Sequence, residues 1–300
     1  MDTSGQTKVP LFPKIVISTK TPQHKNIPGT NVFIIPPNGF TLIDKESTFR
    51  FQDTIFIHAT TMPGINFYQN SKTFTKEKFI KKGKTVIEFS EIKINNLQAK
   101  ISLIKEGSDN IYQIMTGTSS FTTMILASYP SKNEAIGKFI RKSLETIYCD
   151  KAPKIDPFYT SFYRLDDSKS TFKLARSNGS DYLFSKGGIL KTSYDNEPYL
   201  IVTSIPVFLG ANAKNIADEE YSSLAIDQDS TIFDSTKYIN SNQTYERVAF
   251  GKLNDKRTLI FQYSIMLNPK VVLVQGFANK DYENNLTEFR KLSKTIKQQD

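Results

Sequence analysis

Cysteine, histidine and tryptophan are nearly missing from this chain of 300 residues, which has one cysteine, two histidines and no tryptophan. The single cysteine, Cys149, excludes an intrachain disulfide. A structural zinc site needs several clustered cysteine and histidine ligands, so we expect no metal site. A catalytic pairing of Cys149 with His24 or His58 stays open, although a buried structural thiol is the more common use of a lone cysteine.

Nucleotide-binding glycine motifs are also missing. Gly83-Lys84 and Gly137-Lys138 lack the spacing of a phosphate-binding loop, and the G-x-G-x-x-G pattern does not occur. Paired carboxylates for acid–base catalysis cannot be located without the fold. Because no catalytic constellation is in view, the sequence predicts a non-enzymatic protein without a cofactor.

Long apolar runs are a third absence. No stretch approaches the length of a transmembrane helix, so we do not expect an integral membrane protein. The first ten residues, MDTSGQTKVP, lack the apolar core of a secretory signal. Two explanations remain open: the protein is cytoplasmic, or a signal was removed and a Met was placed before the mature chain.

What the chain does contain is typical of a folded, β-rich protein. Hydrophobic residues make up 38% of it, with 14 tyrosines and 22 phenylalanines, which excludes disorder as the dominant state. Short apolar runs separated by Gly, Pro, Asn and Ser favour strands over helices. The net charge of +9 is moderate for this length and lacks the concentrated basic stripe with interleaved aromatics that nucleic-acid binding requires.

The stretch Met115–Ile147 predicts a strand, a Tyr-Pro turn and an amphipathic helix. Phe121–Tyr129 is rich in aromatic and β-branched residues, as is typical of a strand, and Pro130 cannot continue its ladder. Ser131 and Glu134 have the spacing of a helix capping box. The apolar stripe of the predicted helix consists of Ile136, Phe139, Ile140, Ser143, Leu144 and Ile147.

A second version of this stretch closes the chain at Leu259–Ile296. Both predicted helices contain an Arg-Lys pair and end on Thr-Ile, as FIRKSLETI and EFRKLSKTI show. Two further echoes join Leu42–Phe49 to Leu165–Phe172, and Ile55–Pro63 to Tyr199–Pro206. Because the segments recur in one order, we interpret the chain as two copies of one α+β domain, each an antiparallel β-sheet with helices packed on it.

The predicted domain boundaries follow from these repeats and from local composition. Residues 1–32 are an extended Pro- and Lys-rich tail, 33–150 the first domain, 151–157 a linker, and 158–300 the second domain. Each domain has the common size of roughly 130 residues. Within the second domain, residues 175–198 are expected to be an inserted surface loop.

The order of these elements resembles the PsbP-like domains, a superfamily that also holds a Ran-binding nuclear import factor and several bacterial exported proteins. The likeness is clearest in Gly117–Ile147 and fainter in the second domain, where Tyr129-Pro130 becomes Phe277-Ala278 and Gly117 has no clear counterpart. The resemblance implies a sheet with packed helices, no catalysis, and an adaptor role in a larger assembly. It also favours a periplasmic over a cytoplasmic location.

We therefore expect a non-enzymatic interaction or assembly protein, bound to a larger envelope or export complex that can be membrane-embedded. Three alternatives stay open. The first is a carrier of a small apolar ligand or lipid, held between sheet and helix. The second is an immunity-type inhibitor with one tight toxin partner. The third is a hydrolase whose acidic pair converges in a cleft.

Partner contacts are expected from the tail, from the basic stretch Lys76–Lys84 and from the glycine-rich part of the inserted loop. The basic stretch is interpreted first as the solvated side of a short helix or hairpin, and second as a charged rim for an acidic protein or anionic lipid. The candidate residues are Lys8, Phe12, Lys14, Lys76, Lys78, Lys81, Lys82, Gly187 and Gly188.

Overall fold

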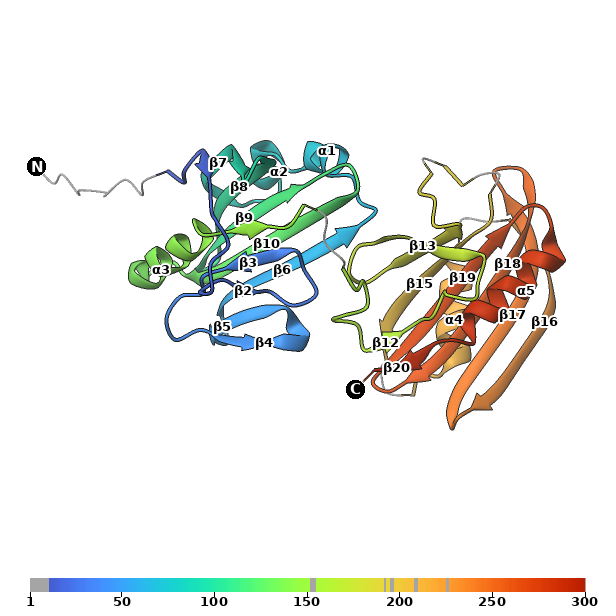
Figure 1. The fold of residues 1–300 in the computed structure, drawn as a ribbon. Helices are drawn as coiled ribbons and strands as arrows, with labels where there is room; N and C mark the ends of the chain where they lie inside the picture. Colours follow the sequence, from blue (N-terminus) through green and yellow to red (C-terminus); the bar gives the residue numbers. More distant parts are fainter. Residues whose placement is uncertain are drawn as a thin grey trace, which may run out of the picture. The chain divides into compact units, whose positions relative to one another are not determined.

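The structure is a computed structural model that describes residues 11–151, 155–191, 193–194, 197–207, 210–224 and 227–299, with the side chains of 227–230 left aside. The chain divides into two compact units, Met1–Thr160 and Ser161–Asp300. Each unit has one large sheet of mostly antiparallel strands with helices packed on it (Figure 1). The fold is therefore α+β, as predicted.

Unit 1 is built on an eight-stranded sheet in the order β1-β7-β8-β9-β10-β6-β5-β4. All neighbours are antiparallel except β1 and β7, which run parallel. The strands are β1 (Ile15–Val16), β4 (Thr41–Ile43), β5 (Thr48–Gln52), β6 (Ile55–Pro63), β7 (Thr85–Ile94), β8 (Leu97–Glu106), β9 (Asp109–Gly117) and β10 (Phe121–Pro130). The turn that joins β7 to β8 has Asn95 and Asn96 at positive φ, as is typical of a two-residue β-hairpin turn.

A small second sheet and three helices complete the described part of unit 1. The sheet pairs β2 (Lys25–Asn26) with β3 (Val32–Ile34), and β3 with β11 (Tyr148–Cys149). The helices are α1 (Phe67–Asn70), α2 (Lys76–Lys81) and α3 (Glu134–Leu144), with 3-10 turns at η1 (Asp44–Glu46) and η2 (Ser71–Thr73). The predicted tail thus contributes β1, β2 and the first residue of β3 to unit 1 and is held by its own domain.

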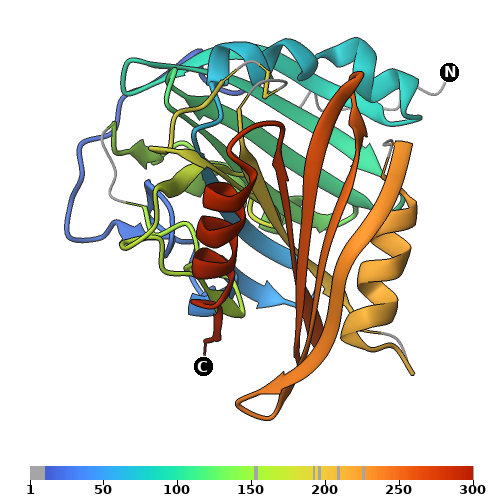
Figure 2. The ribbon, with the colours of Figure 1, turned by 90° about the vertical axis from the view of Figure 1, so that its right-hand side faces the viewer.

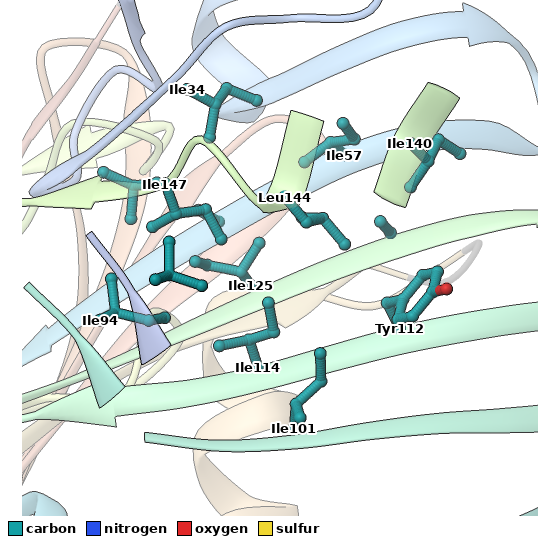
Figure 3. Packing of buried hydrophobic residues seen from close by; sticks show 14 of the residues in the cluster. Ile34, Ile57, Ile94, Ile101, Tyr112, Ile114, Ile125, Ile140, Leu144 and Ile147 are labelled. Atoms are coloured by element: carbon teal, nitrogen blue, oxygen red, sulfur yellow. The ribbon is translucent and has the colours of Figure 1, made fainter. Parts of the chain in front are cut away.

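Helix α3 covers one face of the unit 1 sheet (Figure 3). Ile140, Leu144 and Ile147 are fully buried there with isoleucines of β6, β8, β9 and β10. Burial of side chains of this size contributes roughly 1.5–3 kcal/mol each. The predicted strand and helix are confirmed in this region.

Two details of the α3 prediction are wrong. The helix begins after Asn133, whose side chain accepts a hydrogen bond from the Ile136 amide, so Ser131 is not the N-cap. Phe139 is 56% exposed rather than buried. The reason is Gly137, which lies so close to the Tyr129 ring that an added Cβ would come within 2.5 Å of it. This contact centres the buried arc on Ile140 and leaves Phe139 outside it.

Unit 2 repeats the strand order of unit 1. Its seven-stranded antiparallel sheet runs β13-β14-β15-β19-β18-β17-β16, which matches β4-β5-β6-β10-β9-β8-β7 position by position. The strands are β13 (Phe172–Ser177), β14 (Tyr182–Lys186), β15 (Tyr199–Pro206), β16 (Asp227–Ile239), β17 (Asn242–Leu253), β18 (Lys256–Leu267) and β19 (Lys270–Ala278). A separate pair joins β12 (Tyr163–Arg164) to β20 (Lys297–Gln298), as β3 joins β11 in unit 1.

The structure corrects two sequence expectations for unit 2. Residues 175–198 are not a plain loop, because they contain the end of β13 and all of β14. Tyr182 and Phe184 are buried there, so this stretch has apolar side chains for the core. The echo between Leu42–Phe49 and Leu165–Phe172 does not join equivalent elements. The first segment runs from β4 into β5, whereas the second precedes and just enters β13.

Two helices cover opposite faces of the unit 2 sheet (Figure 2). Helix α4 (Ala213–Ser222) packs Ala213 and Ala217 against Tyr245 and Leu273. Helix α5 (Tyr282–Ser293) packs Phe289 on the other face, with its ring centroid 5.9 Å from that of Phe261. Gly276 is required beneath Phe289, because a Cβ there would lie 2.7 Å from the ring.

An arginine is buried between α4 and the sheet. Arg247 of β17 is 8% exposed and donates to Asp218 of α4 and to the Gln262 amide oxygen. Its guanidinium also lies 4.5 Å from the centroid of the Tyr221 ring. Burial alone would raise the pKa of Asp218, but hydrogen bonds from Lys214 and Arg247 outweigh it and hold that pKa below its usual range.

We expect Asp218→Asn to lower the free energy of unfolding at pH 7 by about 1–2 kcal/mol, because Arg247 is left buried without its counter-charge. The folded pKa of Asp218 is depressed, so the ion pair's contribution is complete above the unfolded pKa of about 4 and is lost as pH falls through the folded value. Urea denaturation at pH 7 and pH 3 measures both effects. The matched control is Glu219→Gln on the exposed side of α4, and equal stability of the two variants would contradict the role of Asp218.

Candidate partner-binding groove

The basic stretch predicted to contact a partner forms α2 and the turn after it. Lys76, Lys78, Lys81 and Lys82 are all exposed, and none has an ion-pair partner among the described residues. The Thr75 hydroxyl caps the helix by accepting from the Lys78 amide at 3.3 Å. The stretch is thus a solvated helix face, and its role as a charged rim stays a prediction.

The predicted glycine pair forms the turn that follows β14. Gly187 and Gly188 have φ of +65° and +70°, and a Cβ on Gly188 would lie 3.0 Å from the Leu174 carbonyl oxygen. The turn is followed by Ile189 and Leu190, which are 59% and 42% exposed. A partner role for this turn stays a prediction as well.

The three candidate residues of the tail, Lys8, Phe12 and Lys14, differ in their placement. Lys8 lies outside the described residues, and Lys14 is exposed. Phe12, in contrast, is 2% exposed and belongs to the core of unit 1. Its side chain is therefore not available to a partner while this segment stays docked.

The segment around Phe12 fills a groove between α3 and β7. The Phe12 amide donates to a Glu88 carboxylate oxygen at 2.7 Å. Arg141 of α3 donates to the Leu11 carbonyl, and its guanidinium lies 5.7 Å from the Phe12 ring centroid. Further along, β1 pairs with the end of β7, and Val16 joins the same core. The chain itself thus covers this part of the unit 1 sheet.

Unit 2 has a groove of about 370 Å³ on the α5 side of its sheet. Alternate residues of β16 form one wall, α5 forms the other, and β17 and β18 form the floor. The side chains that matter for its chemistry are Phe233, Lys237, Glu246, Tyr263, Arg290 and Lys294.

The groove has a net positive charge. Arg290 donates to one Glu246 oxygen through Nε at 2.8 Å and Nη2 at 2.6 Å. Lys237 and Lys294 have no ion-pair partner in the described part of the chain. Burial, and then the nearby Glu246 carboxylate, raise the pKa of Tyr263 to about 12, so its hydroxyl stays protonated at neutral pH. Such a surface favours an acidic ligand.

The outer wall of the groove is also the edge of the sheet. Strand β16 has 13 residues, and only β17 pairs with it among the described strands. Ile232 and Tyr238 are 59% and 72% exposed, and the groove residues Phe233 and Ile239 are 40% and 38% exposed. Sequence reasoning did not single out this surface. The apolar residues that recur along IFDSTKYI were the available signal.

The lone cysteine is not suited to nucleophilic catalysis. Cys149 is buried, and burial raises the pKa of its thiol to about 12, which disfavours the thiolate at neutral pH. The His24 ring nitrogens lie within hydrogen-bond distance of Ser18, Thr21 and the Thr146 carbonyl. Among the described residues, no group of three or more His, Cys, Asp or Glu side chains is placed to hold a metal ion.

Comparisons with known proteins yield distant likenesses to solved structures. Neither a protein-family model nor a curated protein matches the chain. The T6SS immunity protein TplEi of Pseudomonas aeruginosa is 8% identical, with 90% of this chain and 95% of that chain covered, and a TM-score of 0.34. The Tle4-Tli4 complex gives 9% identity, 93% and 98% coverage, and a TM-score of 0.35.

A cyanobacterial PsbP from Synechocystis sp. PCC 6803 gives 12% identity, 46% and 83% coverage, and a TM-score of 0.29. All three TM-scores lie below 0.5, so these likenesses establish no shared function, and membership of the PsbP-like superfamily stays an expectation. No helix in the described ranges is both long and apolar enough to cross a membrane.

The docked segment of unit 1 gives a direct test. We expect Phe12→Ala to lower the free energy of unfolding by about 3 kcal/mol, because it leaves a cavity beneath Arg141. Urea denaturation of the full chain measures the change. Leu11→Ala is the control, since Leu11 is 68% exposed and its truncation should change stability by less than about 0.5 kcal/mol. Equal stability of the two variants would show that the segment is not docked.

Proposed function

We propose that this protein is a non-enzymatic binding protein that holds a partner protein at the groove and edge strand of unit 2. The observation that carries the proposal is β16, a long edge strand with exposed apolar side chains beside a positively charged groove. Soluble proteins usually protect sheet edges against pairing with other chains. An edge that is long, apolar and uncovered among the described residues is therefore suited to a partner.

The nature of the groove favours a protein over a small apolar ligand. The groove is lined by charged side chains from three elements, Lys237, Glu246 and Arg290. A second groove of about 440 Å³ in unit 1 is lined by Lys14, Lys93 and Lys100. Pockets for apolar ligands are mostly lined by apolar and aromatic side chains, so neither groove supports the carrier alternative.

Two forms of this function share the same requirement for a protein partner. In the first, the protein is a subunit of a larger envelope or export assembly, a periplasmic one by the resemblance in sequence. In the second, it is an immunity-type inhibitor of a single toxin. Both use the groove in the same way, and they differ in the number and location of the partners.

Affinity purification of the tagged protein from its own cells tests the proposal, with membrane and soluble fractions kept apart. We expect a stoichiometric partner with the wild-type chain, and at least a tenfold loss of it with the double variant Phe233→Asp and Tyr238→Asp. A membrane complex indicates the assembly role, and one tight soluble partner indicates the inhibitor role.

The matched control is Phe139→Asp, because Phe139 is an aromatic residue on α3 of unit 1 whose exposure of 56% lies between those of Phe233 and Tyr238. Circular dichroism and thermal unfolding check that the variants are folded. A partner that is captured equally by wild type and by the β16 double variant would contradict the proposal, as would a chain that is always recovered alone.

A further inference from the structure

The two units can be aligned residue by residue through their strand pairings. In unit 1, Tyr112 of β9 pairs with Ala127 of β10, which pairs with Ile57 of β6. In unit 2, Phe261 of β18 pairs with Gly276 of β19, which pairs with Leu200 of β15. Ala127 and Gly276 are separated by 149 positions in the sequence, and so are the two helix arginines, Arg141 and Arg290.

Hydrogen bonds at the helix ends agree with this alignment. The Thr146 hydroxyl after α3 accepts from the Ile35 amide at 2.9 Å. The Thr295 hydroxyl after α5 accepts from the Asp166 amide at 3.0 Å. A threonine after the helix therefore makes the same hydrogen bond in both units. The alignment thus extends from the large sheets to the small strand pairs.

The alignment makes the unit 2 groove equivalent to the groove between α3 and β7 of unit 1. Glu88 of β7 pairs with Leu103, which pairs with Tyr112. Phe233 of β16 pairs with Val248, which pairs with Phe261. Glu88 and Phe233 thus occupy the same position. The unit 2 groove corresponds to the place that residues 11–16 fill in unit 1.

In the described part of unit 2, no segment of its own fills this place. Phe33 of β3 pairs with Tyr148 of β11, and Arg164 of β12 pairs with Lys297 of β20. Because Tyr148 and Lys297 are equivalent in the alignment, Phe33 and Arg164 are equivalent too, and they are separated by 131 positions in the sequence. Counted forward by the same interval, the counterpart of residues 11–16 is residues 142–147. Those residues already form the end of α3 and the turn after it. The groove is left uncovered because the chain that would cover it belongs to the core of unit 1.

The groove of unit 2 has more positive charge than the equivalent place in unit 1, although it also gains Glu246. In unit 1, Glu88 accepts a hydrogen bond from the docked segment, which has Lys14 as its charged residue, and Glu145 pairs with Arg141. In unit 2, the same two positions are Phe233 and Lys294. In addition, Lys237 stands where unit 1 has Ile92, since Lys237 lies four positions after Phe233 and Ile92 lies four positions after Glu88. Their pairing partners, Thr244 and Ala99, are equivalent in the same way. A segment for unit 2 should therefore be acidic.

We infer that the unit 2 groove binds an extended acidic segment of a partner protein, a conclusion that rests on the proposed function. The segment runs parallel to β16 and pairs with it near Tyr238 and Ile239, the counterparts of the β7 residues that pair with β1. An aromatic side chain of the segment takes the place of Phe12, against Phe233 and Arg290. An acidic side chain lies against Lys237 and Lys294.

A second copy of this chain is a poorer occupant. Its residues 11–18, LFPKIVIS, contain a lysine and no acidic residue, so Lys237 and Lys294 would repel them. The free segment would also have to leave a groove in which Phe12 is buried.

Two labelled peptides test the inference with the full chain. One is LFPKIVIS, and the other is the same peptide with the Lys14→Glu change. In fluorescence anisotropy at low salt, we expect the Glu peptide to bind about tenfold more tightly, with the difference shrinking as salt is added. A peptide with the same composition in scrambled order should not bind.

Charge reversal in the groove assigns the binding to its site. The double variant Lys237→Glu and Lys294→Glu should reverse the preference between the two peptides. Lys76→Glu and Lys78→Glu on α2 form the matched control and should leave the preference unchanged. Both pairs exchange two exposed lysines, so the net charge of the chain falls equally.

Several outcomes would overturn the inference. They are the absence of binding by the Glu peptide, equal binding of both peptides, or a preference that the Lys237 and Lys294 variant does not change. Tighter binding of the native peptide, together with dimers in analytical ultracentrifugation, would make a second copy the occupant and would also overturn it. If no peptide binds but the partner is still lost with the β16 double variant, the proposed function stands and only this inference fails.

Discussion

The structure depends on one constraint: the apolar face of each sheet must be buried, and the helix that packs on it is too short to cover the whole face. Helix α3 has 11 residues and α5 has 12, whereas the sheets that they cover have eight and seven strands. Each helix follows the strand at the middle of its sheet and packs over that strand and its neighbours. The long hairpin at one edge, β7–β8 or β16–β17, extends beyond the helix and needs separate cover for the same face.

The two units meet this requirement differently. In unit 1, residues 11–16 cross the hairpin face, bury Phe12 and Val16, and pair with β7. In unit 2, the equivalent face is a groove with charged walls, and the β16 side chains next to it are exposed. Unit 1 has Ile92, Ile101 and Ile114 on this face. The equivalent residues of unit 2 are Lys237, Glu246 and Tyr263, whose polar groups tolerate water. The sequence of unit 2 is therefore adjusted to an uncovered face, which fits a surface that exchanges water for a partner.

Sequence reasoning found elements whose residue type and spacing are distinctive. The strand Phe121–Tyr129 and the helix after it follow from these local signals, and the structure contains them, although the helix begins after Asn133 rather than Ser131. It was unreliable where a contact with a distant residue decided the outcome. The contact of Gly137 with Tyr129 leaves Phe139 exposed. Part of the predicted loop at residues 175–198 is a strand of the sheet, because apolar residues such as Phe184 are buried there.

By itself, the sequence determined that this is a folded α+β protein of repeated strand and helix units. These properties depend on composition and on periodicity over ten to twenty residues, which each segment has regardless of its neighbours. Only the tertiary structure decided which residues form the groove. Phe233, Glu246, Tyr263 and Arg290 are brought together by strand register and by the packing of α5. The burial of Phe12 likewise depends on Glu88 and Arg141, which are far from it in sequence. Register is set by the sum of many pairings, so no single segment contains it.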